Sequence, residues 1–181
     1  MNNGKVSFKI AICGILTALS VAWMLVAGFF GVLTYAAPMI AGGMLIVPVK
    51  EYGCKTALTM FAAVSLLGMI LIPDKELALF YLLLFGHYPI MQPFVNRIYV
   101  KPLRVAVKAV IFNGCSVLAV WLAQVIFGIP IADGDKLSWF LLAVFLATAN
   151  VCFALYDRAL LQFYTIYDVK LRVLLHRLFR F

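Results

Sequence analysis

The chain has 181 residues, of which 66% are hydrophobic and 12% are charged, and its mean hydropathy is +1.07. A soluble protein of this size needs far more polar residues to cover its surface, so the composition excludes a soluble domain. The formal net charge of +8 does not indicate a nucleic-acid partner, because its distribution follows membrane orientation.

Six hydrophobic stretches follow one another along the chain. A membrane's hydrocarbon core is about 30 Å thick, and a helix needs about 20 apolar residues to cross it. We therefore predict an all-α integral membrane bundle of six transmembrane helices in residues 1–162, with a basic interfacial segment at 163–181. The predicted spans are residues 8–30, 33–49, 57–72, 77–95, 105–127 and 139–160.

The Lys and Arg residues indicate the orientation of this bundle. Of the 15 such residues, all but Lys75 and Lys136 fall in the ends and loops of one side. Short loops rich in Lys and Arg stay in the cytoplasm. We therefore expect a multi-pass protein of a bacterial cell membrane with both termini in the cytosol, its cations meeting anionic lipid.

The first stretch carries a strip of small residues, Ala11, Gly14, Ala18 and Ala22. Residues three and four apart share one helix face, and small side chains let a second helix approach closely inside lipid. Two interpretations remain open. The strip either packs within the bundle or docks a separate membrane protein.

The second stretch contains Pro38, Gly42, Gly43 and Pro48. Prolines remove backbone donors and adjacent glycines loosen a helix. The stretch is either a kinked packing helix or a helix broken where its backbone lines protein or a watery cavity.

The connection after the third stretch contains residues typical of the end of one helix and the start of the next. Pro73 should end one helix, Asp74 should cap the next, and Glu76 should lie in its first turn. Capping explains these residues more simply than ligand binding does.

Three polar residues lie near the middle of predicted spans: His87, Asn113 and Asn150. A histidine at this depth is costly and rarely faces lipid. The three residues form either a structural latch, with each interhelical bond contributing about 0.6–2 kcal/mol, or a cluster facing a site. We also expect Pro89 and Pro93 to break the fourth helix in its cytoplasmic half.

The chain after the sixth stretch separates apolar and basic residues onto two helical faces from Lys170 onward. This pattern is typical of an amphipathic helix that lies flat on an anionic leaflet. The four cysteines form no CxxC pair and lie in or beside different stretches, so we expect neither disulfides nor a metal site, and no cofactor.

The outline resembles the substrate-binding S component of energy-coupling factor (ECF) transporters. The resemblance rests on the alanine-rich segment at residues 9–22 and on the glycine-containing turn at 49–57. It implies a non-enzymatic subunit that captures a vitamin-like small molecule outside the cell. It also implies docking of a membrane coupling subunit through the small-residue strip, with partner ATPases driving release inside.

In that family the ligand lies toward the outer half of the subunit. Aromatic faces there would stack on a planar ring while a few polar groups orient it. Trp121 and Trp139 also fit an interfacial aromatic belt. The candidate substrate-binding residues are Thr34, Tyr35, Tyr81, Trp121, Gln124 and Trp139.

Two other classes of function remain open. The first is a structural or assembly protein that holds a partner through the first helix and the basic C-terminal segment, without a ligand. The second is an intramembrane enzyme or ion-coupled carrier that uses His87, for which the sequence offers no acidic or nucleophilic neighbour. An outer cavity favours ligand capture, whereas side chains closing that space favour a scaffold.

Overall fold

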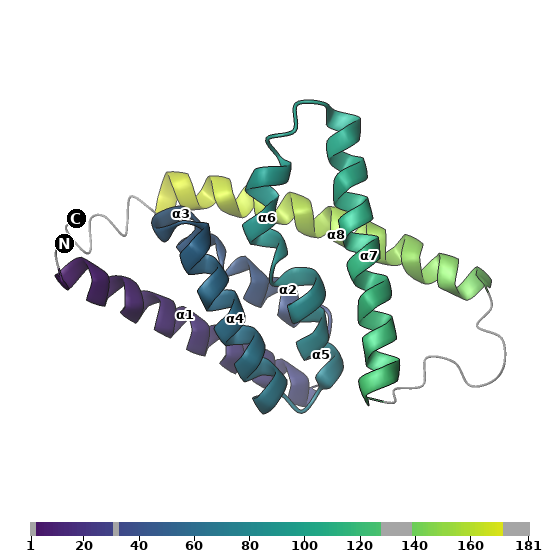
Figure 1. Cartoon of the computed structure of the whole chain (residues 1–181), viewed down its shortest axis with the longest axis horizontal. Helices are drawn as coiled ribbons and strands as arrows, with labels where there is room; N and C mark the ends of the chain where they lie inside the picture. Colours follow the sequence, from purple (N-terminus) through teal and green to yellow (C-terminus); the bar gives the residue numbers. More distant parts are fainter. Residues whose placement is uncertain (1–2, 31–32, 128–138, 172–181) are drawn as a thin grey trace.

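A computed structural model describes residues 3–30, 33–127 and 139–171 (Figure 1), and all of its regular structure is helical. Helices α1 to α4 precede the Asp74 turn, and the remaining elements follow it. In chain order the elements are α1 (Asn3–Phe30), α2 (Ala36–Gly43), α3 (Ile46–Tyr52), α4 (Cys54–Leu71), α5 (Lys75–Phe80), the π-helix η1 (Tyr81–Phe85), α6 (Tyr88–Val95), α7 (Lys101–Phe127), α8 (Trp139–Ile166) and the π-helix η2 (Tyr167–Leu171).

Four segments in the described part of the chain are long and apolar enough to cross a membrane: Val6–Phe30, Cys54–Leu71, Lys75–Val95 and Lys101–Ala119. These candidate spans indicate a multi-pass membrane protein. They correspond to the first, third, fourth and fifth predicted stretches. The second and sixth stretches are helical but are not among these candidates.

The second stretch is two short helices rather than one. α2 ends at Gly43 and α3 begins at Ile46, with a turn at Met44 and Leu45. Pro38 and Pro48 each occupy the third position of a short helix, where a missing N–H breaks no intrahelical bond. Neither half has the roughly 20 residues that a crossing needs.

The fourth stretch is also divided. Asp74 caps α5 as predicted, since its carboxylate accepts hydrogen bonds from the backbone N–H groups of Glu76 (3.1 Å) and Leu77 (3.3 Å). The chain then winds into η1 and bends at residues 86–87 before α6. The break therefore precedes Pro89, whereas the prediction placed it at Pro89 and Pro93; Pro93 lies inside α6 without ending it.

Two apolar clusters form the core. The first joins α1, α2, α4 and α5 through side chains such as Met24, Leu45 and Val64. The second joins η1, α6, α7 and α8 and is rich in aromatic rings. A narrow stripe along α8 and the start of η2 contributes half of this cluster, and the other described faces of α8 are largely exposed. The stripe is Phe153, Tyr156, Leu160, Tyr164 and Tyr167.

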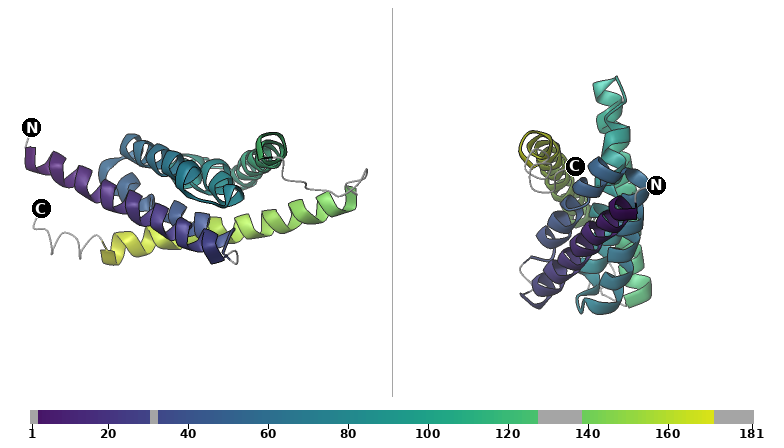
Figure 2. Two further views of the ribbon diagram at one scale, coloured as in Figure 1. Left: turned by 90° about the horizontal axis from the view of Figure 1, so that it is seen from below. Right: turned by 90° about the vertical axis from the view of Figure 1, so that its left-hand side faces the viewer.

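α7 and α8 cross at a steep angle (Figure 1). Figure 2 shows α7 nearly end-on in a view where α8 runs lengthwise. α8 continues to Ile166 and then into η2, so the helix runs past the predicted end of its span at residue 160. Residues 172–181, with most of the predicted interfacial segment, lie outside the described residues.

Helix ends sort into two groups in Figure 1. The starts of α1, α4 and α7 and the ends of α6 and α8 lie toward the left and top of the view. The opposite ends of these helices lie toward the bottom and right. The first group contains the ends that the distribution of Lys and Arg predicts to be cytoplasmic.

Candidate functional site

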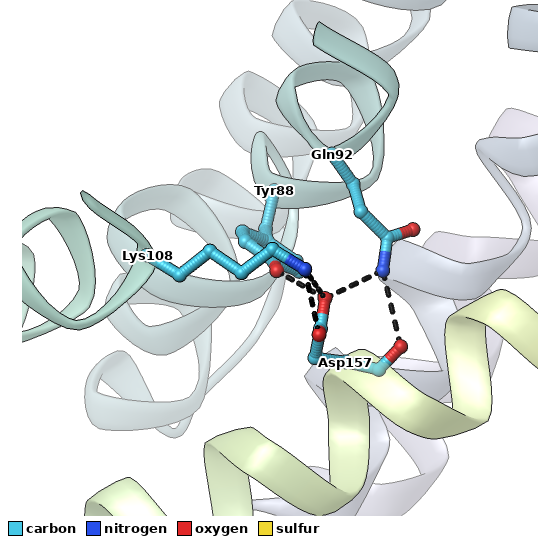
Figure 3. Close-up of polar contacts among 4 residues, drawn as sticks. All are labelled: Tyr88, Gln92, Lys108 and Asp157. Atoms are coloured by element: carbon cyan, nitrogen blue, oxygen red, sulfur yellow. Dashed lines mark hydrogen bonds and ion pairs between the residues drawn. The ribbon is translucent and has the colours of Figure 1, made fainter. Parts of the chain in front are cut away.

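The crossing of α7 and α8 contains a polar cluster around Asp157 (Figure 3). The Lys108 ammonium lies 2.8 Å from Oδ1 and 2.7 Å from Oδ2 of this carboxylate. Gln92 donates from Nε2 to the same Oδ1 (2.7 Å) and to the Asp157 backbone carbonyl (3.0 Å). The Tyr88 hydroxyl donates a further bond to Oδ1.

The local structure explains how these groups meet. Tyr88 and Gln92 are four residues apart on α6, so they share one face of that helix. That face meets Lys108 from α7 and Asp157 from α8. The side chains of Lys108 and Asp157 are only 9% and 17% exposed. Such a charge pair is tolerated away from water because the two charges offset each other and neighbouring donors saturate the carboxylate.

Two further layers extend the crossing. Phe112 of α7 stacks on Phe153 of α8, with ring centroids 4.3 Å apart. Asn113 and Asn150 exchange reciprocal side-chain hydrogen bonds of 3.1 and 3.0 Å. The structure therefore brings together two members of the predicted intramembrane polar cluster, as a bridge between helices.

His87 lies elsewhere, at the bend before α6. Its ring meets the Phe61 ring of α4 edge-on, with centroids 6.5 Å apart. It is half-buried and, among the described residues, makes no hydrogen bond to Asn113 or Asn150.

Tyrosines of α8 replace backbone donors that prolines remove. An α-helical N–H bonds the carbonyl four residues earlier, so Pro89 and Pro93 leave the carbonyls of Phe85 and Pro89 without their usual donors. The Tyr156 hydroxyl donates to the Phe85 carbonyl at 3.2 Å, and the Tyr164 hydroxyl donates to the Pro89 carbonyl at 2.7 Å. α8 thus completes the hydrogen bonding of the broken fourth stretch.

A cavity of about 260 Å³ is lined in part by residues of α7 and α8, and we call it the aromatic cavity. α2, α5, η1, α7 and α8 surround it. Its walls include Tyr35, Met39, Phe80, Phe112, Ser116, Thr148 and Cys152. The Tyr35 and Phe80 rings lie 5.2 Å apart between centroids.

A larger apolar recess of about 560 Å³ lies between α2 and α8, and we call it the α2–α8 recess. It shares Met39 and Cys152 with the aromatic cavity, so the two spaces adjoin. The other walls of the recess include Ile40, Gly43, Met44, Leu155, Ala159 and Phe163.

Among the predicted substrate-binding residues whose side chains the structure describes, only Tyr35 lines the aromatic cavity. The Thr34 hydroxyl lies 3.4 Å from Asp74 Oδ2, and Tyr81 is 1% exposed within the first apolar cluster. Trp121 is 55% exposed on the surface of α7. The side chains of Gln124 and Trp139 lie outside the described residues.

The small-residue strip of α1 faces away from the core. Ala11, Gly14, Ala18 and Ala22 are all exposed, and a Cβ at Gly14 would meet nothing within 4 Å. The opposite face of α1 packs against α2 and α4. Among the described residues, the strip therefore has no packing partner within the chain.

The sequence-based candidates omitted the Asp157 cluster. Lys108 and Asp157 lie close to the ends of the predicted spans at residues 105–127 and 139–160, a position that by sequence alone indicates contact with water. The available signal was the presence of Lys108 and Asp157 inside apolar stretches, together with two hydrogen-bonding side chains spaced by four, Tyr88 and Gln92.

Within residues 3–30, 33–127 and 139–171, no three His, Cys, Asp or Glu side chains gather closely enough to hold a metal ion. The cysteines Cys13, Cys54, Cys115 and Cys152 are all unpaired thiols. The chain matches no protein-family model, no curated protein and no solved structure.

Proposed function

We propose that this chain is the membrane-embedded substrate-capture subunit of an ECF-type uptake transporter for a vitamin-like micronutrient in a bacterial cell membrane. The observation that carries the proposal is the aromatic cavity. Tyr35 directly precedes α2, and Phe80 ends the helix that follows the Asp74 turn. Both positions are near loops that the charge distribution predicts to face outward, so a bound ligand would lie toward the outer half of the subunit.

The exposed strip on α1 supports docking of a coupling subunit. Inside lipid, association between helices depends on close packing, and a row of Ala and Gly permits it. The four small residues Ala11, Gly14, Ala18 and Ala22 are exposed, while the opposite face holds α1 in its own bundle. In this proposal the coupling subunit binds the strip, and its ATPases supply the energy for release.

A second candidate is a structural or assembly protein that binds membrane partners through the same strip. The burial of Tyr81 favours it, because this ring fills space that a larger ligand site would leave open. Trp121 also lies away from the cavity lining. The two candidates differ in one respect that can be measured, which is the presence of a small-molecule ligand.

The test is mass spectrometry of tagged protein, mildly solubilised from native membranes, for both proteins and small molecules. We expect a membrane coupling subunit, paired ATPases and a small organic molecule. The variant Ala18→Leu/Ala22→Leu should lose the protein partners, because two added isobutyl groups block close approach. The matched control Ala62→Leu, on an exposed part of α4, should keep them.

Two results would overturn the transporter proposal. One is recovery of neither ATPases nor ligand from folded, abundant protein. The other is recovery of other membrane proteins through the strip with no small molecule, which would establish the scaffold instead.

A further inference from the structure

The walls of the aromatic cavity offer little to a polar ligand. None of the described residues lining it is charged. The Ser116 hydroxyl is already bonded to the Phe112 carbonyl at 2.8 Å, and the Thr148 hydroxyl to the Val144 carbonyl at 2.9 Å. A polar or ionised group placed here would lose its water without gaining an equivalent partner.

The same walls suit hydrocarbon. Phe80, Phe112 and the Tyr35 ring give flat apolar surfaces, and Met39 gives a flexible side chain that adapts to an irregular shape. Of the three hydroxyls among the described lining residues, only that of Tyr35 is not bonded to a backbone carbonyl one turn earlier, and this side chain is 57% exposed. This arrangement fits a chain-like apolar molecule with at most one neutral polar end.

The route to the cavity runs through the side of the protein. The α2–α8 recess adjoins the cavity at Met39 and Cys152 and is likewise lined by apolar residues. Its rim residues Ile40 and Leu155 are 47% and 65% exposed. In a multi-pass membrane protein such a surface faces acyl chains rather than water, so a molecule dissolved in the bilayer can reach it directly.

We propose that the aromatic cavity binds a neutral, linear, hydrocarbon-rich molecule of the isoprenoid or acyl type, which enters from the bilayer between α2 and α8. This inference rests on the proposed function, because the bound molecule is the captured substrate only if the chain is a capture subunit. The binding itself depends only on the cavity and the recess. The apolar lining formed by the described residues does not favour a water-soluble planar ligand.

Cys152 provides the measurement, because it is exposed and lines both spaces. In liposomes, a variant with Cys13, Cys54 and Cys115 replaced by Ala is reacted with a lipid-soluble maleimide. Farnesol serves as the linear neutral probe and riboflavin as the water-soluble planar one. At about ten times its Kd, farnesol should slow alkylation of Cys152 about tenfold, because roughly one site in eleven stays open. Riboflavin should leave the rate unchanged.

Two glycines give a matched pair of blocking variants. A Cβ at Gly43 meets nothing within 4 Å, so Gly43→Phe can project into the recess without moving the backbone. Gly114 of α7 is equally unobstructed and lies away from both spaces. Gly43→Phe should slow the alkylation without any probe and should abolish farnesol protection. Gly114→Phe should behave like the parent.

The inference is overturned if farnesol gives no protection in folded protein, if riboflavin alone protects, or if Gly43→Phe and Gly114→Phe act alike. Its failure is distinguishable from that of the transporter proposal. Farnesol protection in a protein that purifies without ATPases refutes the transporter and leaves the cavity assignment standing. Recovery of ATPases with a protein that farnesol does not protect refutes the cavity assignment and leaves the transporter proposal standing.

Discussion

Removing one partner of the ion pair between Lys108 and Asp157 should destabilise the protein strongly. Breaking a buried pair typically costs about 3–5 kcal/mol, because one charge stays buried without compensation. After Lys108→Met the Asp157 carboxylate still accepts from Tyr88 and Gln92, so we expect the lower end, about 3 kcal/mol. After Asp157→Asn the Lys108 ammonium loses its only described anionic partner, so the cost should reach at least the same value.

The double variant separates the pair from its surroundings. Lys108→Met/Asp157→Asn removes both charges and leaves a neutral amide beside Tyr88 and Gln92. We therefore expect it to be less destabilised than the sum of the single variants, with a coupling free energy of about 2 kcal/mol. Reversible unfolding by SDS in mixed micelles, followed by circular dichroism, gives the free energy of unfolding of the parent, the two single variants and the double variant.

The chain contains its own control just beyond the C-terminal end of α8, between α3 and η2. Lys50 and Asp168 lie at the same N–O distance of 2.7 Å, but their side chains are 34% and 45% exposed. Solvent screens such a pair, so the cycle Lys50→Met/Asp168→Asn should give a coupling below about 1 kcal/mol. A buried coupling no larger than the exposed one would refute the argument that burial determines the strength of the Asp157 cluster.

The other predictions use the same unfolding assay. Tyr164→Phe should cost about 1–3 kcal/mol, because it leaves the buried Pro89 carbonyl without a donor. Pro93→Ala should remove most of that penalty, since the alanine N–H can bond the same carbonyl, and an unchanged penalty in that background would contradict this account. Gly42→Ala should cost about 1–3 kcal/mol, because its Cβ would lie 2.5 Å from a backbone oxygen. At Gly43 an added Cβ would meet no atom within 4 Å, so Gly43→Ala should be neutral or stabilising by up to about 1 kcal/mol. Equal effects of the two substitutions would show that helix propensity, rather than the close approach at Gly42, determines the change in stability.

Features set by local chemistry were predictable from the sequence. Asp74 caps α5 because a short acidic side chain reaches the first free N–H groups whatever the rest of the fold does. The exposed Ala and Gly strip of α1 follows from helical periodicity, although only the structure shows which way it faces.

Features that depend on distant packing were not predictable. Tyr81 was a candidate ligand residue on a regular helix, but it starts the π-helix η1, whose wider turn changes the facing of the residues along it. Asp157 lies close to the end of an apolar stretch, a position that by sequence alone indicates contact with water. The steep crossing of α7 and α8 instead encloses it with Lys108, and no local pattern encodes that angle.

The two tyrosine bonds from α8 have a consequence for biogenesis. Ribosomes deliver α5, η1 and α6 to the membrane well before α8, and until then the carbonyls of Phe85 and Pro89 lack the donors that Tyr156 and Tyr164 provide. Exposed to lipid, each such group carries a cost of several kcal/mol. The middle of the chain should therefore stay in a hydrated or chaperoned setting during synthesis, and truncation before α8 should leave it a substrate for membrane quality control.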